Sequence, residues 1–180
     1  MRTSTLLAIA IMTTAPTWAP AEVIDSSPSG FTVKLKIAIQ APPAEVYQRL
    51  VHHVGDWWNP AHTYSGDAHN LSIEEKPLGC FCEKLPDGGG VRHMEVIYLA
   101  PGKALGLSGG LGPLQTMAVT GSMRFVISPA ESGSELEVTY AVGGYLKPGL
   151  DSLAKPVDGV LLEQITRLKN YTEHGSPAPK

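Results

Sequence analysis

Two cysteines, a histidine and a glutamate are the residues of this chain whose spacing could support chemistry. Cys80 and Cys82 stand at positions i and i+2 of a strand pattern, so their side chains share one face of the strand. If Asp87-Gly88 forms a tight two-residue turn, the following strand places His93 opposite Cys82 and Glu95 opposite Cys80. Two thiols, an imidazole and a carboxylate on one patch are plausible ligands for zinc or copper.

The same residues allow two other interpretations. In an extended strand the Cα atoms of Cys80 and Cys82 lie about 6.5–7 Å apart, at the long edge of disulfide geometry. A disulfide would therefore need a local distortion, although an oxidising compartment favours its formation. The plainest interpretation is two free, half-buried thiols, an exposed His93 and a cross-strand Glu83–Arg92 pair. We expect the free thiols, no metal and no cofactor, and note that a register slip of one residue would separate His93 from the thiols.

The elements around these residues follow from apolar periodicity. Alternation predicts strands, and a stripe at helical spacing from Val157 to Tyr171 predicts a long amphipathic helix. The predicted order is a strand at 31–39, a helix at 44–54, strand candidates at 71–75, 80–85, 91–100, 103–108, 116–127 and 135–142, and a helix at 156–174. One long helix after a run of antiparallel strands must bury its stripe on the sheet, which favours an α+β fold.

The N-terminus has the features of an export signal. Arg2 gives a short positive region, Leu6 to Met12 an apolar core, and Ala19-Pro20-Ala21 a small-residue cleavage site. We predict a signal peptide over residues 1–21, cleaved near Ala21, and hence a periplasmic or secreted protein. The apolar run is too short to span a bilayer, so no membrane span is predicted.

The charge of the remaining chain excludes some partners. Removal of 21 of the 180 residues leaves 159, with 13 basic and 17 acidic side chains. No basic stripe is present, which argues against nucleic acid as a partner. We predict a linker at 22–30, one domain at 31–174 and a disordered tail at 175–180.

Several motifs in this order resemble the SRPBCC superfamily, which includes START domains, birch-pollen-allergen-like proteins and polyketide cyclase-like proteins. The chain is most similar to the branch related to the C-terminal domain of the heat-shock ATPase activator. The matching segments are Ala41 to Tyr47, Trp57-Trp58, Pro77 to Glu83, Ala100 to Leu105 and Leu161 to Tyr171. The resemblance implies a helix-grip fold, in which a curved antiparallel sheet of six to seven strands wraps around the C-terminal helix, with two short helices after the first strand and a cavity in between.

The resemblance places Trp57-Trp58 at the mouth of that cavity. One of the two rings is expected in the core and the other against a ligand, with His62 and Tyr64 in the same loop as polar contacts. Tyr98, Tyr140 and Tyr145 are candidates to bring hydroxyls to the interior. The predicted ligand-binding residues are therefore Trp57, Trp58, His62, Tyr98 and Tyr140, and the segment 109–113 is predicted to form a flexible lid or a loop.

Three functions remain open from the sequence. The first is a binding or carrier protein for a small hydrophobic or amphipathic molecule. The second is a cyclase- or hydrolase-like enzyme with His62, His93, Glu95 or Tyr140 as acid/base candidates, although no nucleophile motif is present and no catalytic residue is identified. The third is a metal or thiol-redox accessory protein built on Cys80, Cys82 and His93.

Overall fold

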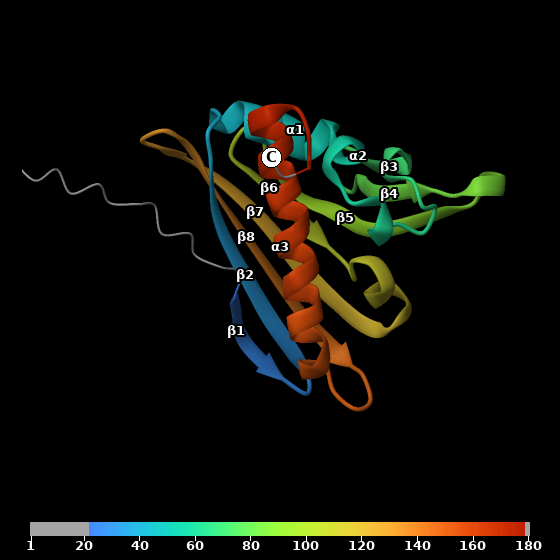
Figure 1. Ribbon diagram of the computed structural model, residues 1–180. Coiled ribbons are helices and arrows are strands. Elements are labelled where there is room, and N and C mark those ends of the chain that lie inside the picture. Colours follow the sequence, from blue (N-terminus) through green and yellow to red (C-terminus); the bar gives the residue numbers. More distant parts are fainter. Residues whose placement is uncertain (1–21, 179–180) are drawn as a thin grey trace, which may run out of the picture.

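The computed structural model describes residues 22–178 of the chain. The predicted signal peptide, residues 1–21, lies outside the described residues, as do the last two residues of the predicted tail. The fold is α+β, an open, curved, antiparallel sheet with one long helix against it (Figure 1).

The sheet has eight strands, in the spatial order β1-β2-β8-β7-β6-β5-β4-β3. The strands are β1 (Glu22–Ser27), β2 (Gly30–Ile39), β3 (Leu71–Ile73), β4 (Cys80–Lys84), β5 (Gly90–Ala100), β6 (Ala104–Ser108), β7 (Ala118–Ala130) and β8 (Gly133–Tyr145). The helices are α1 (Pro43–His52), α2 (Val54–Trp57) and α3 (Asp151–His174), with short 3-10 turns η1 (Pro60–His62), η2 (Ala68–Asn70), η3 (Pro86–Gly88) and η4 (Gly112–Thr116).

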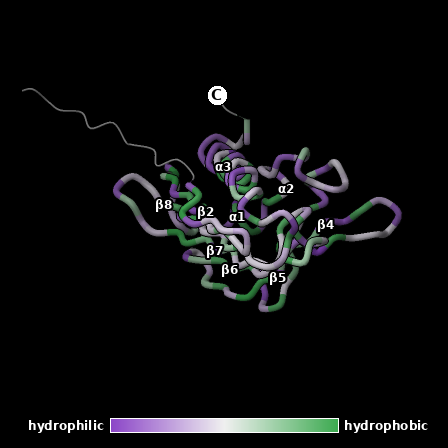
Figure 2. The backbone as a smooth tube through the Cα atoms, turned by 90° about the horizontal axis from the view of Figure 1, so that it is seen from below, coloured by the Kyte–Doolittle hydropathy of each residue, from purple (hydrophilic) through white to green (hydrophobic). Residues whose placement is uncertain are grey.

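The alternate apolar side chains of the long strands form the core. On β2, alternate residues from Phe31 to Ile39 are all buried, as the alternation predicted. On β8, Leu136, Val138, Tyr140 and Val142 are buried in the same way. Figure 2 shows the strands following an arc beside α3. The buried side chains of the strands and those of the helix stripe belong to one core cluster. The apolar surface removed from water there is the main favourable term in folding.

Helix α3 packs mainly on one side of the sheet. Its main contacts with strands are those with β2 and β1, and it also contacts α1 and α2. Ile165 and Leu168 are buried in these contacts. Gly175 ends the helix in the left-handed conformation, with φ of 72°, and donates its N–H to the carbonyl of Tyr171. Because the helix stands away from β4 and β5, space is left under that half of the sheet.

Three predictions about the elements need correction. Residues 22–27, expected as linker, pair with β2 as the edge strand β1, which raises the strand count to eight. The helix expected at 44–54 is interrupted at His53 into α1 and α2. Helix α3 begins at Asp151 rather than at Pro156, because the fully buried Leu150 anchors its first turn.

No helix among the residues from 22 to 178 is long and apolar enough to cross a membrane.

The docking of α3 can be tested with two leucines of the same helix. Leu168 is 0% exposed and Leu162 is 38% exposed. We expect Leu168→Ala to lower the free energy of unfolding by about 2–5 kcal/mol, because it removes buried methyl groups and leaves a void. The matched change Leu162→Ala should cost less than about 0.5 kcal/mol. Urea denaturation measures both, and equal effects would mean that the stripe is not docked on the sheet.

Candidate functional site

A cavity of about 350 Å³ lies between α3, the curved sheet and two loops. It occupies the space that α3 leaves free beside β4 and β5. Most of its lining is aliphatic or aromatic, and the buried part consists of Trp58, Leu71, Phe81, His93, Leu114, Tyr140 and Leu161. This matches the expected position between the sheet and the C-terminal helix.

The more exposed lining residues mark the mouth. They come from the loop after α2, from η4 and from the start of α3, and include Ala61, His62, Tyr64, Pro113 and Pro156. His62 Nε2 lies 3.0 Å from Glu163 Oε2, and this pair joins the loop to α3. Arg167 Nε donates to the backbone carbonyl of Trp57 at 2.8 Å and adds a second link. The mouth is therefore held by polar contacts between the loop and the helix.

The two tryptophans occupy different environments. Trp57 is 1% exposed, and its Nε1–H donates to the carbonyl of Arg49 at 2.9 Å, inside the core. Trp58 lines the cavity, and its Nε1–H donates to the carbonyl of His62 at 3.1 Å. The ring of Trp58 also meets Phe81 edge-on, 5.7 Å between centroids. Trp58 thus offers an aromatic wall to the cavity, and Trp57 supports it from behind.

Tyr140 lines the cavity and holds the glycine-rich loop. Its hydroxyl donates to the carbonyl of Gly109 at 3.1 Å and accepts from the N–H of Leu111 at 2.9 Å. Burial raises the pKa of Tyr140 to about 12, so the hydroxyl stays protonated. A side chain at Gly121 would meet this ring, because a Cβ there would lie 2.5 Å from Tyr140 Cε2. The segment 109–113, expected as a flexible lid or a loop, is therefore tied to β8.

A β-bulge turns His93 into the cavity wall. Cys80 pairs with Glu95, as predicted, but the register then shifts, and Cys82 pairs with Arg92 instead of His93. The extra residue on β5 lets both His93 and Met94 point to the buried side. The conditional prediction that His93 faces the thiols is wrong for this reason, and so is the plainer expectation of an exposed His93, because its side chain is buried.

Glu83 is the functional residue that the sequence interpretation missed. It was assigned to a surface pair with Arg92, but it is 1% exposed and lies 3.0 Å from His93 Nε2 through Oε2. The backbone N–H groups of Tyr64 and Ser65 also donate to its carboxylate. Its position two residues after Phe81, on the buried phase of β4, was the available signal.

The environment fixes the protonation of this pair. Burial alone would raise the pKa of Glu83, but the hydrogen bonds from Ser65, Tyr64 and His93 outweigh it and lower that pKa. Burial lowers the pKa of His93, and the carboxylate of Glu83 offsets only part of that effect. An ionised carboxylate can only accept, so Nε2 carries the proton of a neutral imidazole and Nδ1 is left as an acceptor.

Nδ1 of His93 has no hydrogen-bond partner. Three buried side-chain atoms among the described residues are in this position, and the other two belong to Tyr47 and Gln164. Of the three residues, His93 is the one that lines the cavity. Its ring lies 5.3 Å from that of Phe81 and 6.0 Å from that of Tyr64, between centroids. His93 and Tyr64 also border a second recess of about 500 Å³ between β5 and the segment 108–120.

Two predicted tyrosines lie away from the cavity. Tyr98 is 49% exposed and Tyr145 is 72% exposed. Arg124 covers the Tyr98 ring at 5.3 Å from its centroid, on the outer face of the sheet. Tyr98 is therefore not a ligand-binding residue of this cavity, because its phase on β5 after the second register shift points outward.

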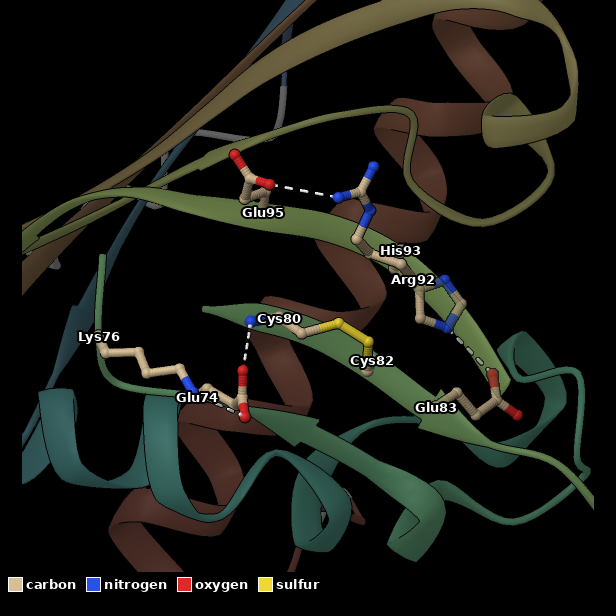
Figure 3. Close-up of a disulfide and its surroundings, with 8 residues drawn as sticks. All are labelled: Glu74, Lys76, Cys80, Cys82, Glu83, Arg92, His93 and Glu95. Carbon is tan, nitrogen blue, oxygen red and sulfur yellow. Dashed lines mark hydrogen bonds and ion pairs between the residues drawn. A yellow bond between two sulfur atoms is a disulfide. The ribbon is translucent and has the colours of Figure 1, made fainter. Parts of the chain in front are cut away.

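The two cysteines form a disulfide, so the expectation of free thiols is wrong (Figure 3). Their Cα atoms are 5.2 Å apart, closer than in a regular strand, and fall within disulfide geometry. In Figure 3 the bridge lies on β4 apart from the Glu83–His93 pair, while Arg92 turns to Glu95 at 3.2 Å. The four proposed metal ligands are not brought together, and no group of three such ligands occurs in the chain between residues 22 and 178.

No family model matches the sequence, and no curated protein matches it. Solved structures do share the fold. The conserved protein of unknown function EF2215 from Enterococcus faecalis is 16% identical with a TM-score of 0.58, covering 88% of this chain and 80% of its own. SSP2350 from Staphylococcus saprophyticus is 11% identical with a TM-score of 0.59, and the match covers 81% of this chain and 93% of SSP2350. DynU16, a protein of the dynemicin biosynthetic locus, is 18% identical with a TM-score of 0.57, covering 81% of this chain and 48% of its own.

The buried pair should make folding sensitive to acid. Both pKa values are lower in the folded chain than the ordinary values of 6.5 for histidine and 4.5 for glutamate. The unfolded chain therefore binds more protons below about pH 6.5, and stability falls as the pH falls. We expect the double variant Glu83→Gln/His93→Phe to lose less free energy of unfolding than the wild type between about pH 7 and about pH 4.

Urea denaturation at several pH values measures this difference. Glu131→Gln, at an exposed turn, is the matched control and should keep the wild-type pH dependence. Parallel pH profiles for the wild type and the double variant would contradict the proposed protonation.

The disulfide predicts the outcome of thiol titration. The protein unfolded without reductant should show no reactive thiol, and after reduction it should show both of its two cysteines. Mass spectrometry after alkylation measures the same difference. Two thiols in the unreduced protein would contradict the bridge.

Proposed function

We propose that the protein binds or carries a small hydrophobic or amphipathic molecule in the cavity beside α3. The observation that carries the proposal is the cavity itself, about 350 Å³ of mostly apolar lining with an open mouth. Ligand pockets are concave, mostly apolar and furnished with a few polar groups, and this size is within their range. An apolar cavity of about 150 Å³ holds benzene, so this one has room for a ligand of roughly two fused rings.

The arrangement of the wall supports this proposal. Trp58 and Phe81 offer aromatic faces, and Leu114 and Leu161 offer aliphatic ones. The loop that carries His62 and the glycine-rich loop held by Tyr140 border the mouth, so a ligand can reach the interior without separation of α3 from β2. A likeness to the SRPBCC superfamily, many of whose members bind apolar molecules in this place, is in keeping with the proposal.

We place this activity outside the cytoplasm. The supporting features are the export-signal pattern from Arg2 to Ala21 and the Cys80–Cys82 disulfide, since disulfides persist in oxidising compartments. The partner is the small molecule. Neither nucleic acid nor a membrane span is part of the proposal.

A second candidate is a cyclase- or hydrolase-like enzyme in the same cavity. The observation that favours it is the buried Glu83–His93 pair, in which a carboxylate orients an imidazole whose other nitrogen is unpartnered. This arrangement suits a general base. DynU16, a structural neighbour from a biosynthetic locus, is compatible with either function.

Filling the cavity tests the binding function. Val160 lines the cavity from α3 and is partly exposed, so Val160→Trp can occupy the space without removal of a core residue. We expect the affinity for an apolar probe such as anilinonaphthalene sulfonate to fall at least roughly tenfold, which is about 1.4 kcal/mol. Displacement titration measures the affinity, and native mass spectrometry of protein from its own compartment detects a co-purifying molecule.

The matched control is Tyr98→Ala on the outer face, which should leave the affinity unchanged. Unchanged binding in Val160→Trp, or equal losses in both variants, would place the probe elsewhere and contradict the proposal.

A further inference from the structure

We propose that Nδ1 of His93 accepts a hydrogen bond from an uncharged hydroxyl group of the ligand. This inference rests on the proposed binding function and adds the chemical class of the ligand. That class is a compact ring compound with one hydroxyl on an otherwise apolar skeleton, for example a phenol or an alicyclic alcohol.

The first argument is the state of the other polar groups in the wall. The Tyr140 hydroxyl already donates to Gly109 and accepts from Leu111. The His62 ring is paired with Glu163 at the mouth, and the Thr63 hydroxyl donates to the carbonyl of Pro60 at 2.7 Å. His93 alone among the buried lining residues has a side-chain atom that is buried and unpartnered. A buried acceptor without a partner costs free energy, and a ligand that donates to it recovers that cost.

The second argument is the direction of the hydrogen bond. Glu83 accepts from Nε2 of His93, and the N–H groups of Tyr64 and Ser65 also donate to its carboxylate. The carboxylate is thereby fixed as an acceptor, and the imidazole has its proton on Nε2. Nδ1 can then only accept, so the ligand must supply the donor. Figure 3 shows Glu83 and His93 turned toward each other from neighbouring strands, with the other ring nitrogen directed away from the carboxylate.

The third argument is the charge of the surroundings. A ligand carboxylate could not donate, and it would bring a second negative charge close to Glu83. A ligand ammonium would have to leave water for a wall of Trp58, Phe81 and Leu114, where the carboxylate of Glu83 already accepts three hydrogen bonds. An uncharged hydroxyl avoids both the repulsion from Glu83 and the loss of charge hydration. Its O–H group can donate to Nδ1 of His93, the unpartnered acceptor. Glu83 acts in this scheme as a positioning residue, because it sets the tautomer of His93 and touches no ligand.

The experiment compares three ligands of nearly the same shape: a naphthol, its methyl ether and naphthalene. Calorimetric titration of the wild type should give an affinity for the naphthol roughly 10-fold to 100-fold above that for the ether, which lacks the donor. The preference should disappear in Glu83→Gln/His93→Phe, which removes the acceptor without leaving a buried charge unpaired. Tyr98→Phe, which removes an exposed hydroxyl on the outer face of the sheet, is the matched control and should keep the preference.

A measurement on the wild type keeps the test independent of that variant's folding. Nitrogen NMR of the His93 ring should find the proton on Nε2 and should show the Nδ1 signal moving on addition of the naphthol and not of the ether. Equal affinities for the naphthol and the ether, with binding of both lost in Val160→Trp, would overturn this inference and leave the proposed function intact. A preference kept in the double variant, or a proton found on Nδ1, would also overturn it. Failure of all three ligands to bind would overturn the proposed function together with this inference.

Discussion

The contact between α3 and the β1–β2 edge of the sheet is the constraint on which the rest of the structure depends. The helix must hide an apolar stripe that includes Ile165 and Leu168, and its main contacts with the curved sheet are with β2 and β1. A straight helix cannot follow the whole arc, so it cannot also fill the space beside β4 and β5. The cavity is the geometric consequence of a straight element against a curved one, and the interactions that stabilise the fold also maintain it.

Two sets of polar contacts add to this apolar packing. The Tyr140 hydroxyl ties the glycine-rich loop to β8, and the loop with His62 is joined to α3 through Glu163. Each buried polar group in these contacts has a hydrogen-bond partner, as is usual for buried polar groups. Nδ1 of His93 departs from that pattern, and a polar atom left without a partner in a cavity wall is where a binding site differs from a packed core.

The β-bulge in β5 has effects on both faces of the sheet. On the cavity side, the bulge lets His93 as well as Met94 point inward, and His93 thereby reaches Glu83. On the other side it leaves Cys82 opposite Arg92, and the two cysteines bond to each other instead of to a metal. One inserted residue thus separates the disulfide from His93, which the sequence interpretation had placed on a common patch with the two cysteines. Solved structures of similar fold at 11–18% identity share the frame, while such a local feature belongs to the individual chain.

The sequence by itself determined most of the strands and the long C-terminal helix that packs against them. Periodicity is a local property, so the alternation of β2 and the stripe of α3 could be read from the sequence alone. Trp58, His62 and Tyr140, which were named as ligand-binding candidates, line the cavity. Register is not local. A shift of one residue turns a side chain to the opposite face of the sheet. The register of β4 against β5 depends on the turn at Pro86–Gly88 and on the bulge in β5, and both are fixed by pairing across strands. Only the tertiary structure could therefore decide that Tyr98 points outward and that Glu83 meets His93 inside, because each depends on which neighbour a strand residue faces.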